Sequence, residues 1–174
     1  MFTNPVKNLK AFGLRENMIV ADLGAASGFY TISAASLAPN GKVYAIEIQK
    51  DFLITIKNKA VELGLKNVEY LLGDIEKRGG TKLKDEITDA VIVSNVLSQV
   101  EDRNKFIDEA KRILKSKGKL LLVDWTLDSS VTKTSFNKNI SKNNARELFE
   151  KAGFVWQRDI DAGLHHYGII FIKN

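Results

Sequence analysis

The sequence has 174 residues, of which 44% are hydrophobic and 27% charged, a balance typical of a globular chain with a substantial core. It contains no cysteine, which excludes disulfide bonds, a thiol nucleophile and cysteine-ligated metals. No apolar run reaches the length of a membrane span, and no secretory signal opens the chain, so we expect a cytoplasmic protein. We expect residues 1–174 to form a single domain.

Short apolar runs alternate with helix-period segments along the chain. The runs that favour buried strands are bounded by turn residues; they span residues 19–23, 42–47, 67–72, 88–94 and 119–125. The segments that favour helices place apolar residues on one face; they span residues 29–37, 51–63, 102–114 and 141–152. Residues 154–161 and 165–172 predict a terminal hairpin.

Three segments are less regular. Residues 6–12 form a short amphipathic piece, either a helix over a ligand site or a cover for a sheet edge. Residues 75–86 are polar and predict a loop. Residues 126–140 are rich in Ser, Thr and Asn, and we expect them to be mobile.

Strands that alternate with helices predict an α/β protein whose parallel sheet carries helices on both faces. The terminal hairpin adds an antiparallel pair to this sheet. In open sheets of this kind, ligands bind beyond the C-terminal ends of the strands. The residues at those ends are therefore the candidates for function.

Residues 19–31 carry the strongest local signal. Asp22 ends the first strand, and Gly24 and Gly28 bracket a turn of small residues before the first long helix. Backbone N–H groups and the positive end of a helix face such a turn, and small residues let a ligand approach the backbone. An acidic residue at the opening suits a ligand with a positive group. The turn lacks two glycines of the dinucleotide-binding fingerprint.

Polar residues also end the next three strands: Glu47, Asp74 and the pair Ser94-Asn95. Glu47 follows the acid of the first strand by 25 residues, close to the spacing at which an acid meets ribose hydroxyls. Asp74 can accept a hydrogen bond from an adenine amino group, with neighbouring isoleucines packed on the ring. The strand ends together predict a nucleoside-like ligand.

The first turn resembles motif I of class I S-adenosylmethionine (SAM)-dependent methyltransferases, Asp/Glu-x-Gly-x-Gly-x-Gly. Asp22, Gly24 and Gly28 match, and Ala26 replaces the middle glycine. The added methyl group is expected to narrow the space for the amino-acid tail of the cofactor.

The resemblance covers nearly the whole chain, from about residue 5 to residue 173. Residues 94–100 and 109–119 are similar to the small quinone-biosynthesis methyltransferase-like group. The resemblance implies a Rossmann-like fold with a seven-stranded, mostly parallel sheet, an antiparallel C-terminal hairpin and helices on both faces. It also implies SAM as the cofactor.

In this family the matching positions hold the methionine end, the ribose, the adenine and the region of the transferring methyl group, in chain order. The cofactor-binding residues that the resemblance implies are Asp22, Gly24, Ala25, Ala26, Ser27, Gly28, Tyr30, Thr31, Glu47, Ile48, Gly73, Asp74, Ile75, Ser94 and Asn95.

The start of the last strand is expected at the same edge, because that strand is read as antiparallel to the others. His165, His166 and Tyr167 are therefore expected at the mouth of the site. We hypothesise that one histidine, with Tyr167, positions or deprotonates the methyl acceptor; a purely structural role is the alternative. Adjacent histidines in a strand point to opposite faces, so they do not form a metal pair. The residues expected to bind substrate at this mouth are Gln99, Asp124 and Trp125.

A small molecule is the expected acceptor. The absence of cysteine removes cysteine-dependent methyl transfer, including 5-methylcytosine formation and arsenic methylation as usually performed. The net charge of +5 admits a nucleic-acid partner, but the densest basic cluster, residues 111–119, is expected on the opposite edge of the sheet. A non-catalytic SAM-binding module and an RNA methyltransferase of the same fold stay open as alternatives, as does the oligomeric state.

Overall fold

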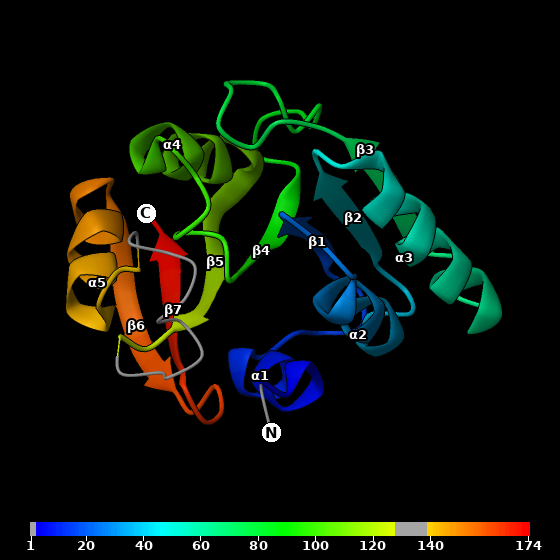
Figure 1. The fold of residues 1–174 in the computed structure, drawn as a ribbon, viewed down its shortest axis with the longest axis horizontal. Helices are drawn as coiled ribbons and strands as arrows, with labels where there is room; N and C mark the ends of the chain where they lie inside the picture. The colour runs from blue at the N-terminus through cyan, green and yellow to red at the C-terminus, as the bar shows by residue number, and fades with distance from the viewer. Residues whose placement is uncertain (1–2, 128–138) are drawn as a thin grey trace.

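The computed structural model describes residues 3–127 and 139–174. Residues 128–138, the larger part of the segment expected to be mobile, lie outside the described residues. Figure 1 shows the arrangement of the helices and strands. The strands are β1 (Ile19–Leu23), β2 (Lys42–Glu47), β3 (Val68–Leu72), β4 (Thr88–Ser94), β5 (Leu114–Trp125), β6 (Phe154–Ile160) and β7 (His166–Lys173). The helices are α1 (Pro5–Phe12), α2 (Phe29–Leu37), α3 (Lys50–Glu62), α4 (Arg103–Ile113) and α5 (Lys142–Lys151).

All seven strands join one sheet in the order β3-β2-β1-β4-β5-β7-β6. The strands from β3 to β5 run parallel, whereas β7 is antiparallel to both β5 and β6. β3 and β6 lie at opposite edges of the fan of strands in Figure 1. The predicted seven-stranded, mostly parallel sheet with an antiparallel C-terminal pair is confirmed.

The two faces of the sheet are covered by different helices. Along β4, Val91 and Val93 pack in one apolar cluster with residues of α4 and α5, whereas Ala90 and Ile92 pack in another with α1 and α2. This division follows from the alternation of side chains along a strand. Because both faces are buried, the central strands are almost continuously apolar.

The structure decides the position of the amphipathic N-terminal segment. Leu9 and Phe12 of α1 are buried in the cluster that contains α2 residues, and the side chain of Asn4 caps the helix by accepting from the Lys7 N–H at 3.0 Å. Thr3, just before α1, lines the cavity described below. The N-terminal segment thus covers a face of the sheet and also reaches the site.

β5 begins earlier than the sequence predicts. The sequence predicts a turn at residues 116–118, between the helix that ends at residue 114 and the strand that begins at residue 119. These turn residues lie inside β5, whose pairing with β4 shifts register between Thr88 and Ala90. Lys117 has a left-handed backbone with φ 62°, and a Cβ on Gly118 would lie 2.7 Å from Leu114. The turn residues therefore form an irregularity within a strand that starts directly after α4, instead of a separate turn.

Candidate active site

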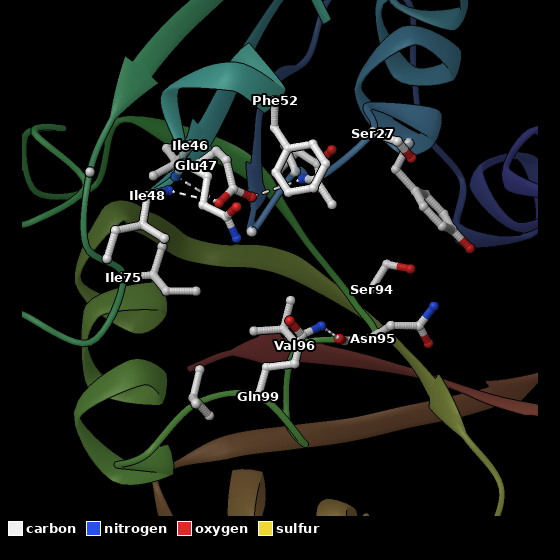
Figure 2. Close-up of a pocket in the computed structure, with 18 of the residues that line it drawn as sticks. Ser27, Ile46, Glu47, Ile48, Phe52, Ile75, Ser94, Asn95, Val96 and Gln99 are labelled. Carbon is white, nitrogen blue, oxygen red and sulfur yellow. Dashed lines mark hydrogen bonds between the residues drawn. The ribbon is translucent and has the colours of Figure 1, made fainter. Parts of the chain in front are cut away.

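A cavity of about 330 Å³ lies at the C-terminal ends of β1, β2, β3 and β4. This volume is at the lower end of the range for small-molecule sites. Figure 2 shows Ile48 and Ile75 toward one end of the cavity, and Ser94 and Asn95 toward the other. The expected cofactor-binding residues that line it are Asp22, Gly24, Ala25, Ala26, Ser27, Tyr30, Glu47, Ile48, Gly73, Asp74, Ile75, Ser94 and Asn95.

The backbone of the first turn requires its two glycines. Gly24 and Gly28 both have positive φ, and an added Cβ would lie 2.9 Å from Val96 and 2.6 Å from Ile56, respectively. Ala26 also has a positive φ, of 44°, so the residue that departs from the motif adopts a conformation that glycine adopts without strain. Gly28 itself is not part of the cavity lining.

Asp22 is buried at the end of β1, with 2% of its surface exposed. The Thr31 hydroxyl donates to its Oδ2 at 2.6 Å. Burial raises the pKa of Asp22 to about 6, and the nearby Glu47 carboxylate adds to the rise. Thr31 lies behind the cavity wall and therefore orients Asp22 from outside the lining.

Glu47 links the first turn to the start of α3. Its Oε2 accepts from the Ala26 N–H at 2.9 Å, and its Oε1 accepts from the N–H groups of Ile48 and Gln49 at 2.9 and 3.0 Å. Figure 2 shows these bonds as dashed lines. An ionised carboxylate has about four acceptor positions, so this one keeps capacity for a ligand hydroxyl.

The end of the cavity near β2 and β3 is largely apolar. Ile46 and Phe52 line it beside the expected Ile48 and Ile75. Asp74 accepts from the Glu76 N–H at 3.0 Å through Oδ1 and pairs with Lys77 at 2.9 Å through Oδ2. The hydrogen bond from Lys77 lowers the pKa of Asp74, so the carboxylate is ionised and still able to accept from a ligand.

The sequence analysis missed several residues that line the cavity. The helix period placed Phe52 on the apolar face of its helix, and nothing in the sequence assigned the others to the lining. These additional lining residues are Thr3, Phe29, Ile46, Gln49, Phe52, Glu76, Val96 and Val100. For Phe29 and Gln49, the signal was their place directly after Gly28 and Ile48, which were expected to bind the cofactor.

Of the three residues expected to bind substrate, only Gln99 lines the cavity. Asp124 is 2% exposed, and its carboxylate accepts from the N–H groups of Leu97 and Trp125 at 3.1 and 2.8 Å. Arg103 donates to the carbonyl of Leu97 at 2.8 Å. Asp124 and Arg103 thus bind the backbone N–H and the backbone carbonyl of Leu97, in the loop that follows β4. Burial raises the pKa of Asp124 to about 6.

The three residues expected at the catalytic centre do not line the cavity. His165 precedes β7 with φ 72°. The ring of His166 lies 4.0 Å from the ring of Trp125, and burial lowers its pKa. The Tyr167 hydroxyl donates to the carbonyl of Ile140 at 3.3 Å. A direct catalytic role for these residues stays a prediction.

The basic cluster of residues 111–119 lies at the end of the sheet opposite the cavity, where the parallel strands begin. Lys115 pairs with Asp89 at 2.7 Å, and Asp89 also accepts from the N–H of Ile19 at the start of β1. Arg112 pairs with the buried Glu109 at 2.8 Å. Within residues 3–127 and 139–174, no group of three or more His, Asp or Glu residues converges as a metal site would require.

The fold and the residues at the strand ends define a class: a Rossmann-like protein of the methyltransferase type. A family model described as "Methyltransferase domain" matches residues 14–153. The chain belongs to this methyltransferase domain family. In the part of the chain that the structure describes, no helix is long and apolar enough to cross a membrane.

Individual relatives agree with the family. A crystal structure of a SAM-dependent methyltransferase from Aquifex aeolicus has a TM-score of 0.89 and 29% identity, with 99% of this chain and 91% of that chain covered. The UbiE ubiquinone/menaquinone biosynthesis C-methyltransferase of Pasteurella multocida is 30% identical over 66% of this chain and 42% of that protein. An arsenite methyltransferase of Halobacterium salinarum is 27% identical over 67% of this chain and 30% of that protein. The chain thus spans less than half the length of these two curated relatives.

Proposed function

We propose that this protein is an enzyme that transfers the methyl group of SAM to a small-molecule acceptor. The observation that carries the proposal is the cavity itself, in which residues from four consecutive parallel strand ends meet. The chemistry of the lining fits SAM. It combines an apolar end, a carboxylate with spare acceptor capacity, a second buried carboxylate and a turn in which backbone approaches closely.

The lining residues contact different parts of SAM. Glu47 accepts from a ribose hydroxyl, the isoleucines Ile48 and Ile75 pack against the adenine, and Asp74 accepts from its amino group. Asp22 faces the positively charged methionine end. When bound, SAM supplies an electrophilic methyl group on a sulfonium, a reactive centre that needs mainly proximity and alignment.

Calorimetric titration tests the proposal, with SAM, S-adenosylhomocysteine, NAD and FAD as separate ligands. The expected result is binding of SAM and S-adenosylhomocysteine and none of the two dinucleotides. A preference for NAD or FAD would overturn it. Formation of S-adenosylhomocysteine in the presence of a panel of small hydroxyl, amino and carbon acceptors then separates an enzyme from a non-catalytic SAM-binding module.

An acceptor that is a small molecule is favoured over RNA by the distribution of charge. The lysines and arginines of residues 111–119 lie at the end of the sheet opposite the cavity, and two of them, Arg112 and Lys115, are paired with acidic groups. Arsenite is disfavoured as an acceptor, because the chain has no cysteine. An RNA substrate would instead require binding that weakens steeply as salt is raised.

A further inference from the structure

A group of uncharged polar side chains lies at the β4 end of the cavity. The hydroxyls of Thr3 and Tyr30 lie 3.0 Å apart, and Asn8 donates to Thr3 at 2.7 Å and to Tyr30 at 2.8 Å. Ser94, the last residue of β4, also contributes its side chain to the cavity lining. Thr3, Tyr30, Ser94 and Asn95 all line the cavity; we call these four residues the polar collar.

Asn8 holds the collar in place from outside the cavity. This residue of α1 is fully buried, and its amide places one N–H on each of the two hydroxyls. Either hydroxyl of the Thr3–Tyr30 pair can be the donor to the other. Tyr30 can therefore present either its proton or a lone pair to a ligand, while its oxygen keeps one position.

Asn95 supplies an acceptor that the described residues leave without a partner. Its side-chain Oδ1 is buried and makes no hydrogen bond within residues 3–127 and 139–174. A buried carbonyl oxygen without a partner is destabilising. Its backbone has φ 57°, in the left-handed region that Asn adopts more readily than most residues. Figure 2 shows the Asn95 side chain beside Ser94, away from Glu47 and Ile48.

We propose that the polar collar receives the nucleophilic group of the methyl acceptor, and that this group is a hydroxyl or an amine. The inference rests on the proposed function, and it names the acceptor class for the same site. Asn95 Oδ1 accepts the N–H or O–H of the nucleophile, and Tyr30 fixes its second hydrogen-bonding position. A carbon nucleophile would leave the buried Asn95 Oδ1 unpaired.

Methyl transfer at the collar is a displacement at the methyl carbon. A lone pair of the acceptor oxygen or nitrogen forms the bond to the methyl carbon, and the carbon–sulfur bond breaks with its electron pair on sulfur. The proton of the hydroxyl or amine leaves to water. Asn95 and Tyr30 orient the lone pair and take no proton themselves.

Sinefungin tests the collar without a known acceptor, because it carries an amino group where SAM carries the methylsulfonium. Calorimetry measures the dissociation constants of sinefungin and S-adenosylhomocysteine, which has no group at that position. The proposal expects sinefungin to bind about tenfold more tightly, since its ammonium donates to Asn95 Oδ1 and to the Tyr30 oxygen. Tyr30→Phe and Asn95→Gly should each reduce this preference at least about fivefold, and Asn95→Asp should increase it.

The variants also separate the collar from other roles. Asn8→Ala should reduce the sinefungin preference, because Tyr30 loses its anchor, whereas Tyr70→Phe on β3, outside the lining, should leave it unchanged. Thermal unfolding confirms that each variant is folded. The inference is overturned if sinefungin is not preferred, or if Tyr30→Phe weakens both ligands equally, which would place Tyr30 at the amino-acid tail. If the parent protein binds neither sinefungin nor S-adenosylhomocysteine, the proposed function is overturned instead.

Discussion

Single residues in this protein perform two tasks at once, and Glu47 is the clearest case. Its carboxylate accepts three backbone N–H groups from the first turn and the start of α3, and the proposed function also assigns it to the ribose. A residue in this position shapes the cavity before any ligand arrives. Substitutions there should therefore change both stability and affinity.

Glu47→Ala should lower the free energy of unfolding by about 1–3 kcal/mol, because three backbone N–H groups lose their acceptor. It should also weaken the binding of S-adenosylhomocysteine at least about tenfold, because the ribose loses an acceptor. Urea denaturation and calorimetry measure the two effects. Glu47→Gln is the matched control: it keeps one acceptor oxygen, so its stability loss should be smaller. Unchanged affinity in a folded Glu47→Ala protein would remove Glu47 from the ribose role.

Asp22 should make ligand binding depend on pH. Its pKa of about 6 in the free protein means that the carboxylate is mostly protonated at pH 5. If the ionised form binds the positive methionine end, the SAM dissociation constant should rise about tenfold between pH 7.5 and pH 5. Calorimetry at both pH values measures this change. Asp22→Asn should show a flat profile; a parent profile equally flat would contradict the role.

The raised pKa of Asp22 also makes the stability of the protein depend on pH. The native state holds the Asp22 proton more tightly than the unfolded chain, whose pKa is near 3.8. Burial of the ionised form is therefore a penalty that is present above about pH 6 and is relieved as the pH falls toward 3.8. Urea denaturation of the Asp22→Asn protein at pH 8 should give a higher free energy of unfolding than that of the parent.

At the scale of elements, one buried carboxylate fixes the long loop between β3 and β4. Glu109 of α4 is 1% exposed and accepts from the N–H groups of Gly79 and Thr81, from the Thr81 hydroxyl and from Arg112. Burial alone would raise the pKa of Glu109, but the hydrogen bonds from Arg112 and Thr81 lower it to about 2. The loop carries Asp74 and Ile75 of the cavity at its start.

Glu109→Ala should lower the free energy of unfolding by about 3 kcal/mol, because two loop N–H groups lose their acceptor and the mostly buried Arg112 guanidinium keeps only the exposed Asp85 as its carboxylate partner. Asp108→Ala, at the exposed neighbouring position of α4, is the control and should change stability little. The contribution of Glu109 is present above pH 4.5 and is lost as the pH falls through about 2. Acid and urea denaturation followed by circular dichroism measure both effects.

The start of β7 is the element on which the histidine hypothesis depends. His166→Ala removes a ring packed on Trp125, and His165→Ala leaves a left-handed position occupied by a residue that tolerates it less well. If either histidine acts on the acceptor, its variant should bind SAM like the parent and turn over more slowly. If both variants turn over as fast as the parent protein, the histidines have a structural role.

At the scale of the whole molecule, the sheet separates charge from chemistry. The cavity lies at the C-terminal ends of the parallel strands, and the basic cluster of residues 111–119 lies where they begin. The double substitution Lys115→Glu and Lys117→Glu should therefore leave SAM affinity within about twofold, since exposed charges at this distance are screened. Calorimetry tests this; the double variant should lose some stability, because Asp89 loses its partner. A large loss of affinity would contradict the separation.

The sequence by itself determined which segments form strands, the mostly parallel sheet with its antiparallel terminal pair, and the strand ends at which Asp22, Glu47, Asp74 and Asn95 lie. These features depend on local turns and on the period of apolar residues, which are readable along the chain. Only the tertiary structure decided that Asn8 anchors Tyr30, that Asp124 holds the Leu97 peptide, and that β5 contains its own irregularity. Those contacts join elements far apart in sequence, and their partners depend on how whole helices and loops pack, which no local pattern records.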